Sequence, residues 1–193
     1  MTPGIIGAMV DKGAIIVFHM HQGERAMSAD QNEKRTRVVT WTHPSKSARN
    51  SQEISGFDYL CAVRDGKREP PPVAKLLGYR IASVSKGQAV FELLPAEYLY
   101  NPFSTVHGGI LMTLLDTAMT AAVMTLLSKG EACSTLEMKS NLLRPVTDKI
   151  GLIRAQGNVL HMGHRTATCE GKIMGSQGSP MAAALGTSMI MRA

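Results

Sequence analysis

Residues 107–127 read HGGILMTLLDTAMTAAVMTLL, and this stretch decides the fold. Its apolar residues recur at helical spacing and cover almost the whole circumference of the helix that they predict. A helix that is apolar on nearly every side is buried in the interior of a domain. We therefore expect one long central helix from His107 to about Leu127, ended by the cation and glycine of Lys129 and Gly130.

Predicted strands lie on both sides of this helix in the sequence. Two short runs, 79–84 and 88–94, are joined through Ser85-Lys86-Gly87 and indicate a β-hairpin. Longer runs of the same kind follow the helix at 133–143, 151–161, 165–175 and 181–191. Because turns link these runs, they favour an antiparallel sheet. One apolar helix with these strands predicts an α+β domain of the hotdog architecture, in which a curved antiparallel sheet wraps the central helix.

The segment before the hairpin predicts a short N-terminal helical extension. Ser55 is a suitable helix cap, apolar residues follow it at helical spacing, and Gly66 is a suitable stop. After a run of prolines, residues 73–77 predict one more helical turn. Residues 1–54 show no apolar periodicity, so we expect a largely irregular extension ahead of a domain at 55–193. Residues 1–26 are either an upstream extension or an over-called start, because Met27 precedes a typical N-terminal sequence.

Composition narrows the classes of partner. The net charge is +6 at pH 7, but no run of Lys and Arg concentrates it and only 5% of residues are aromatic, so we expect no nucleic-acid partner. The 3 cysteines are odd in number and lack metal-ligand spacing, which favours a reduced, cytoplasmic protein. No apolar run is long enough to span a membrane, so we expect no membrane partner either.

Three stretches carry a resemblance to a known family: NPFSTVHGGILMTLLDTAM at 101–119, STLEMKSNLLRPV at 134–146 and VLHMGHRTATCEG at 159–171. In this order and spacing they resemble the hotdog-fold acyl-CoA thioesterases of the phenylacetate-degradation (PaaI-like) type, over roughly residues 55–191. The resemblance implies hydrolysis of acyl-CoA thioesters to CoA and a carboxylic acid, with no metal or organic cofactor. It also implies a homodimer, or a tetramer built from two dimers.

The start of the central helix contains the first candidate site residues. Backbone N–H groups in a first helical turn are unpaired and favour an anion, so the Gly108 N–H is a candidate oxyanion donor. In the functional interpretation, Gly109 contacts the substrate next to Gly108. The alternative is that Gly108 and Gly109 only permit a tight turn between the loop and the helix. Asn101 before Pro102 is ordinary turn chemistry, and the resemblance makes it also a candidate second donor. The resemblance makes His107 a supporting residue that shapes the site.

Asp116 is the sharpest candidate, because an acid among apolar helix residues is costly without a partner or a function. In thioester hydrolysis it serves either as general base for water or as nucleophile. Thr135 matches the hydroxyl position with which the family holds the water or the carboxylate, and Ser134 is one residue away. Both are also ordinary strand hydroxyls. The resemblance assigns the nucleotide end of CoA to cations in predicted turns, namely Arg144, His164 and Arg165.

The separation of Gly108 and Asp116 constrains the site. The two residues are eight positions apart on one predicted helix, which is about 12 Å of rise. One thioester carbonyl cannot contact both. Either one residue is idle, or each site takes Gly108 from one chain and Asp116 from its two-fold mate, and the resemblance supports the second arrangement.

Two rival functions share the expected fold. A non-catalytic acyl-CoA-binding or regulatory protein has no need of Asp116 beside the His-Gly-Gly sequence. A hydratase needs an Asp and a His a few residues apart on the active helix, and no His follows Asp116 before His161. The sequence therefore favours hydrolysis and leaves the acyl group open.

Overall fold

The computed structural model describes residues 10–11, 14–15, 33–45 and 53–192. The chain divides into two compact units, Met1–Val38 and Val39–Ala193. In the first unit, β1 (Val10–Asp11) and β2 (Ala14–Ile15) pair in antiparallel fashion. Most of the expected irregular extension lies outside the described residues. The predicted domain boundary after residue 54 therefore stays a prediction.

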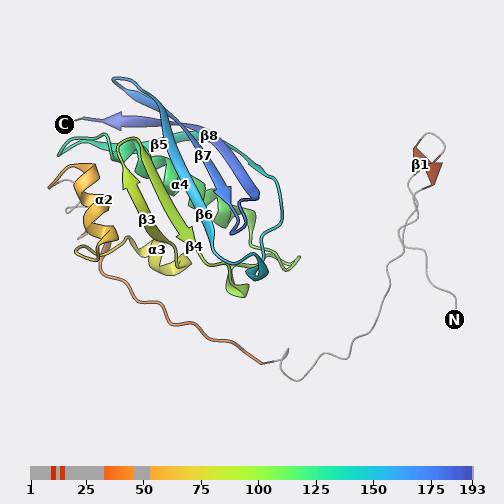
Figure 1. Cartoon of the computed structure of the whole chain (residues 1–193). Helices are drawn as coiled ribbons and strands as arrows, with labels where there is room; N and C mark the ends of the chain where they lie inside the picture. The colour runs from red at the N-terminus through yellow and green to blue at the C-terminus, as the bar shows by residue number, and fades with distance from the viewer. Residues whose placement is uncertain (1–9, 12–13, 16–32, 46–52, 193) are drawn as a thin grey trace, which may run out of the picture. The chain divides into compact units, whose positions relative to one another are not determined.

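The second unit carries the helices and strands that position the site (Figure 1). In chain order they are α2 (Gly56–Arg64), α3 (Pro72–Leu77), β3 (Arg80–Ser85), β4 (Gln88–Leu93), η2 (Glu97–Leu99), α4 (Gly108–Met124), β5 (Ala132–Leu142), η3 (Asp148–Ile150), β6 (Ile153–Met162), β7 (Thr166–Met174) and β8 (Pro180–Met191). Each predicted strand is present, with its ends within a few residues of the predicted ends.

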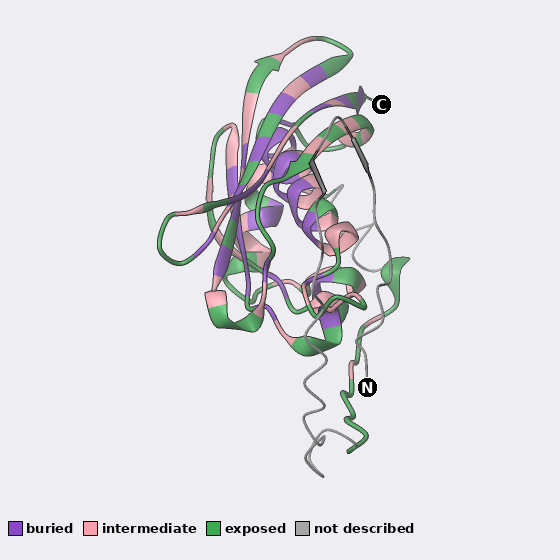
Figure 2. Ribbon diagram, turned by 90° about the vertical axis from the view of Figure 1, so that its right-hand side faces the viewer, coloured by how far each residue is buried: buried purple, intermediate pink, exposed green. Residues whose placement is uncertain are grey.

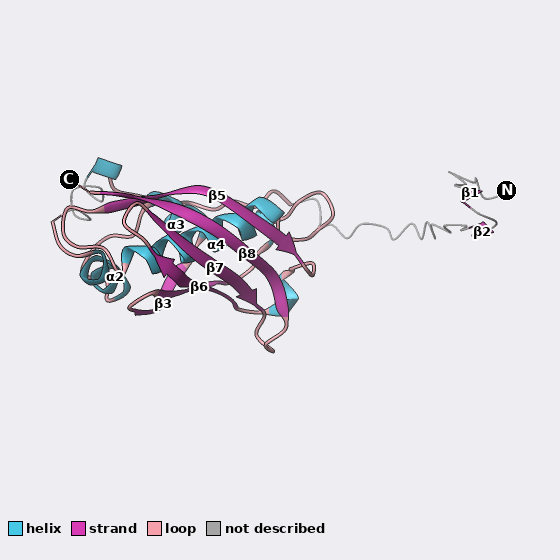
Figure 3. Ribbon diagram, turned by 90° about the horizontal axis from the view of Figure 1, so that it is seen from above, coloured by secondary structure: helices cyan, strands magenta, loops and turns pink. Residues whose placement is uncertain are grey.

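One six-stranded sheet has the order β3-β4-β6-β7-β8-β5, and every neighbouring pair is antiparallel. Figure 3 shows the strands passing over α4, so that the sheet curves around the helix. This arrangement confirms the predicted hotdog architecture. β5 follows α4 directly in the chain and forms one edge of the sheet, which leaves its outer side unpaired within the described part of this chain.

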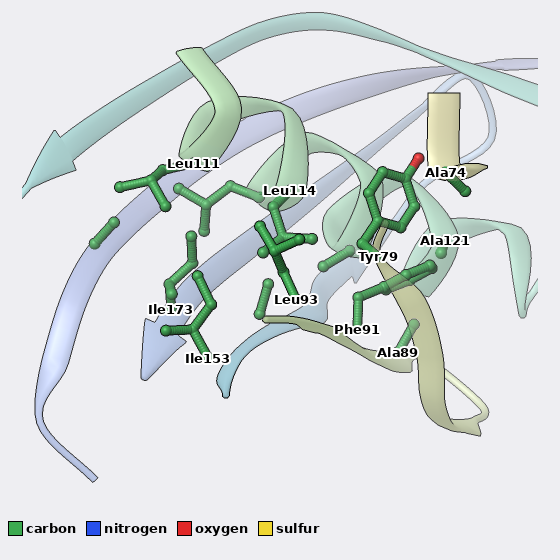
Figure 4. Close-up of a cluster of buried hydrophobic side chains, with 14 of the residues drawn as sticks. Ala74, Tyr79, Ala89, Phe91, Leu93, Leu111, Leu114, Ala121, Ile153 and Ile173 are labelled. Carbon is green, nitrogen blue, oxygen red and sulfur yellow. The ribbon is translucent and has the colours of Figure 1, made fainter. Parts of the chain in front are cut away.

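The side of α4 that faces the sheet fills the core. Its buried residues include Leu111, Leu114, Leu115 and Ala118, and Figure 4 shows Leu111 and Leu114 near Ile153 and Ile173 of β6 and β7. The opposite side is less covered than the sequence predicts, since Met112 is 39% exposed. Figure 2 shows the same contrast, with buried residues gathered on α4 and on the strands around it. α4 is thus apolar over a larger part of its surface than the described residues of one chain bury.

The central helix ends earlier than predicted, at Met124 instead of about Leu127. Leu126 and Leu127 donate backbone hydrogen bonds to the carbonyls three residues earlier, which tightens the last turn. The buried Thr125 hydroxyl donates to the Ala122 carbonyl (2.6 Å) and accepts from the Gly87 N–H (2.7 Å). The β3–β4 turn therefore holds the end of α4. Helix propensity cannot predict this contact, because it joins residues far apart in the sequence.

The N-terminal helical extension of the domain is confirmed. Ser55 caps α2, where its Oγ accepts from the Asp58 N–H at 3.2 Å. Gly78 ends α3 in the left-handed conformation, with φ 84°. Among the described residues, no helix is long and apolar enough to cross a membrane.

Candidate active site

Asp116 faces a cavity beside α4, and one of its carboxylate oxygens is held by Thr135. The Thr135 Oγ1 donates to the Asp116 Oδ1 at 2.6 Å. The Thr120 hydroxyl lies 3.1 Å from the Thr135 hydroxyl, so two hydroxyls are linked in a row to the acid. The Asp116 Oδ2 makes no hydrogen bond among the described residues. The carboxylate is therefore oriented through one oxygen, while the other oxygen has no hydrogen bond from the described part of the chain.

An irregularity in β5 positions Thr135. The pairing between β5 and β8 shifts register between Thr135 and Glu137, so Leu136 is an extra residue and is 56% exposed. Bulges of this kind re-aim neighbouring side chains and are frequent near active sites. Here the bulge leaves Thr135 opposite the buried Ser188 and directed toward α4.

The cavity encloses about 700 Å³. Asp116, Thr117 and Thr120 of α4 line it together with Cys133, Ser134 and Thr135 of β5. Its remaining lining is mostly apolar and comes from α2, α3, β3, β4 and the C-terminal half of α4. Ligand pockets have this composition, with a few converging polar groups in apolar walls.

The helix N-terminus is a separate feature of the site. His107 caps α4, and its Nδ1 accepts the Gly109 N–H at 3.0 Å. An accepting Nδ1 carries no proton, so this contact gives His107 an orienting role at the start of the helix. The Gly108 N–H makes no hydrogen bond among the described residues, and it is the donor that the sequence singles out. A methyl group on Gly108 would come within 2.6 Å of the Leu142 Cδ1.

Asn101 organises the loop before the helix. Its Oδ1 accepts from the Phe103 N–H (2.9 Å) and the Thr105 N–H (3.3 Å). Its Nδ2 donates to the Thr105 Oγ1 at 3.0 Å. These bonds are those of a turn-forming Asn. The sequence left two roles open for Asn101, and the hydrogen bonds within this chain support the role of holding the loop.

The structure brings only part of the predicted set together. Asp116, Ser134 and Thr135 share the cavity lining, whereas the remaining predicted residues lie outside it: Asn101, His107, Gly108, Gly109, Arg144, His164 and Arg165. The Arg144 Nη1 donates to the Pro180 carbonyl at 2.6 Å. Exposed side chains of His164 and Arg165 follow β6, in the turn before β7.

Thr120 and Tyr79 are lining residues that the sequence interpretation missed. Thr120 is four residues after Asp116, and this spacing on one helix face was a usable signal. Tyr79 precedes β3 and had no such signal. Burial raises the pKa of Tyr79, a hydrogen bond with Thr117 lowers it, and the negative charge of Asp116 raises it further. The phenol is therefore neutral beside the acid.

Cys133 is the lining residue least suited to ionic chemistry. Burial chiefly raises the pKa of its thiol to about 12, and the nearby Cys169 and Asp116 add to the effect. Its Sγ donates to the Thr120 carbonyl at 3.8 Å. Cys61, Cys133 and Cys169 are all free thiols, so none of them is committed to a disulfide.

Residues 103–182 match the family described as the Thioesterase superfamily. A 1,4-dihydroxy-2-naphthoyl-CoA hydrolase of Listeria monocytogenes is 32% identical over 97 residues, which are 50% of this chain and 77% of that protein.

Solved structures show the same likeness. A phenylacetic acid degradation-related protein from Ralstonia eutropha is 28% identical with a TM-score of 0.62, over 68% of this chain and 98% of that one. The E. coli PaaI protein from the phenylacetic acid degradation operon is 25% identical with a TM-score of 0.60, over 78% and 96%.

Proposed function

Because the chain belongs to the thioesterase superfamily, we propose that it hydrolyses acyl-CoA thioesters to free CoA and a carboxylic acid. The observation that carries the proposal is the Asp116 carboxylate, held by Thr135 at 2.6 Å in the wall of an apolar cavity. The likeness to a hydrolase of an aromatic acyl-CoA supports the CoA ester as substrate.

Asp116 supplies the base or the nucleophile through its unbonded oxygen. As a base, it takes a proton from water while the water oxygen attacks the thioester carbon. As a nucleophile, its oxygen forms a mixed anhydride and expels the CoA thiolate, and water then splits the anhydride. Both routes break the same C–S bond and yield the same products. The Thr135 hydroxyl orients the carboxylate in either route.

The developing oxyanion requires hydrogen-bond donors placed before the reaction. The Gly108 N–H fits this role, since it is unpaired at the positive end of the α4 dipole. Gly108 and Asp116 are separated by about 12 Å along α4, and Gly108 does not line the cavity of its own chain. We therefore assign the oxyanion donor of each site to Gly108 of the partner subunit.

We propose that the partner is a second copy of this chain, which would pair with the exposed edge of β5. Among the strands that the structure describes, β5 has no partner along its outer edge over Ala132–Leu142, and exposed edges of this length invite pairing. Apolar side chains near this edge are exposed, among them Leu142 (46%) and Leu143 (50%). Pairing of β5 with β5 would cover them and bring the two α4 helices together. A tetramer of two such dimers is the larger form of the same proposal.

The other predicted site residues take supporting roles in this proposal. Asn101 and His107 hold the loop and helix start that carry Gly108 and Gly109, and these two glycines border the substrate in the other subunit's site, while Ser134 borders it in the cavity of its own chain. Arg144, His164 and Arg165 are exposed residues for the nucleotide end of CoA. The expectation of a reaction without metal or organic cofactor remains part of the proposal.

The test is a thiol-release assay with aromatic and aliphatic acyl-CoAs, on wild type and Asp116→Asn. The substitution keeps the shape and removes the acid, so activity should fall about 10²–10⁴-fold while acyl-CoA binding and melting temperature persist. Glu170→Gln, which changes an exposed acid on β7, is the matched control and should retain activity. Wild-type activity in Asp116→Asn refutes the catalytic assignment. A wild-type protein that binds acyl-CoA without hydrolysing it favours the non-catalytic binding protein.

A further inference from the structure

α2 and α3 border the cavity that contains Asp116, and both helices precede the matched family region at 103–182. From α2, Leu60 and Val63 line the cavity, and from α3, Val73 and Ala74. These two helices, here called the helical wall, therefore contribute much of the apolar surface that a ligand beside Asp116 would touch.

The cavity extends away from Asp116 along α4. Its α4 lining runs from Asp116 through Ala121 to Met124, which is eight residues or about 12 Å of helix. Opposite this row lie Tyr79, Ile81 and Phe91, and the rings of Tyr79 and Phe91 meet edge to face with centroids 5.8 Å apart. Figure 4 shows Tyr79 and Phe91 beside Ala121 and Ala74, with the Tyr79 oxygen directed toward the α3 side. A two-carbon acyl group would fill only the Asp116 end of this space.

Contacts with the end of α4 and with the β3–β4 turn hold α2, the first helix of the wall, in place. The Gly56 N–H donates to the Leu127 carbonyl at 3.2 Å. A methyl group on Gly56 would come within 2.1 Å of the Met124 carbonyl oxygen, so α2 and α4 are packed backbone to backbone. Lys86 adds a cation–π contact to Phe57, with 4.8 Å to the ring centroid. α2 is thus fixed against α4, and α3 contributes lining residues to the same cavity.

We propose that the helical wall sets the acyl specificity, and that the enzyme prefers medium- or long-chain hydrophobic acyl groups to short ones. This inference rests on the proposed function. Within the length of the cavity, each methylene transferred from water into its apolar lining should raise kcat/KM by about fourfold. The rise should stop when the cavity is full.

The experiment measures kcat/KM for acetyl-, hexanoyl-, decanoyl- and palmitoyl-CoA in wild type and three tryptophan variants. Val63→Trp and Val73→Trp add bulk to the cavity lining from α2 and α3, and the more exposed Val73 gives the variant better able to fold. Leu76→Trp is the matched control, since Leu76 lies on α3, is 53% exposed and does not line the cavity. The wall variants should lose about tenfold or more on the longest substrates that wild type accepts, and little on acetyl-CoA. The control should keep the wild-type profile.

Binding of non-hydrolysable acyl-CoA thioethers, followed by calorimetry, separates this inference from the proposed function. If wild type hydrolyses acyl-CoA but prefers acetyl-CoA, or if folded wall variants keep its chain-length profile, the inference is wrong and the proposed function stands. If nothing is hydrolysed but thioether affinity rises with chain length in wild type and not in the wall variants, the proposed function falls and the wall assignment stands. Absence of both hydrolysis and chain-dependent binding overturns both.

Discussion

Two threonine hydroxyls are linked in a row to the Asp116 carboxylate, and their proposed roles can be told apart by substitution. Thr135→Val removes the donor at 2.6 Å from the carboxylate, and a hydrogen bond to a charged group is worth about 1.5–3 kcal/mol. We expect kcat to fall about tenfold to a hundredfold with KM nearly unchanged, and Thr135→Ser to restore most of it. Thr120→Val removes only a contact between neutral hydroxyls and should cost less than about tenfold.

Steady-state kinetics and melting curves of the three variants check this prediction. If Thr120→Val costs more than Thr135→Val at equal stability, the positioning role belongs to Thr120. If Thr135→Val raises KM without changing kcat, Thr135 binds the substrate and does not orient the acid.

The Cys133 thiol gives a prediction with a defined pH dependence. Its pKa is raised to about 12, so the protonated form is favoured. At pH 8, about four units lower, roughly 10⁻⁴ of the thiol is ionised. Alkylation of folded protein by iodoacetamide should therefore be slow at Cys133 and increase about tenfold per pH unit below that pKa. Timed labelling with peptide mass spectrometry measures this rate, with the unfolded chain as control. Equal rates in the folded and unfolded chains at pH 8 contradict the assignment.

At the scale of elements, the close contact of α2 with α4 determines whether the helical wall is rigid. Gly56→Ala places a methyl group against the Met124 backbone, which cannot move without displacing a helix. Overpacking of this kind costs about 1–3 kcal/mol, so the melting temperature should fall. Gly108→Ala is the matched control, because its methyl group would meet only the end of the Leu142 side chain, and that side chain can rotate. Calorimetry that shows the same loss in both variants would contradict the special role of the α2–α4 contact.

At the scale of the whole molecule, the proposed composite site predicts complementation between two inactive homodimers. In Gly108→Val the donor position is blocked, and in Asp116→Ala the acid is absent. After refolding at equal amounts, about half of the dimers are mixed, and each mixed dimer has one intact site and one site with both lesions. Recovered activity should approach about a quarter of wild type if sites act independently. Native mass spectrometry confirms that mixed dimers formed, and no recovery in their presence would rule out the shared site.

Local signals in the sequence determined most of the elements. Periodicity located α4 and the strands, and the cap at Ser55 and the run of prolines before residue 73 located α2 and α3, because these signals depend on neighbours close in the chain. An acid among apolar helix residues made Asp116 a candidate, and the family resemblance made Thr135 one; the fold joins the two by a hydrogen bond. The early end of α4 was not predictable, since it depends on Gly87 and Lys86 from a distant turn.

Only the tertiary structure decided which residues share a cavity. Tyr79, Val63 and Val73 carry no motif, and they line the same cavity as Asp116 only because distant segments of the chain are brought together there. The same packing separates Gly108 from the cavity and leaves the edge of β5 exposed. A sequence specifies the periodic burial of each element through local side-chain chemistry. Contacts between residues far apart in the chain decide which side of a helix faces other elements, a cavity or solvent.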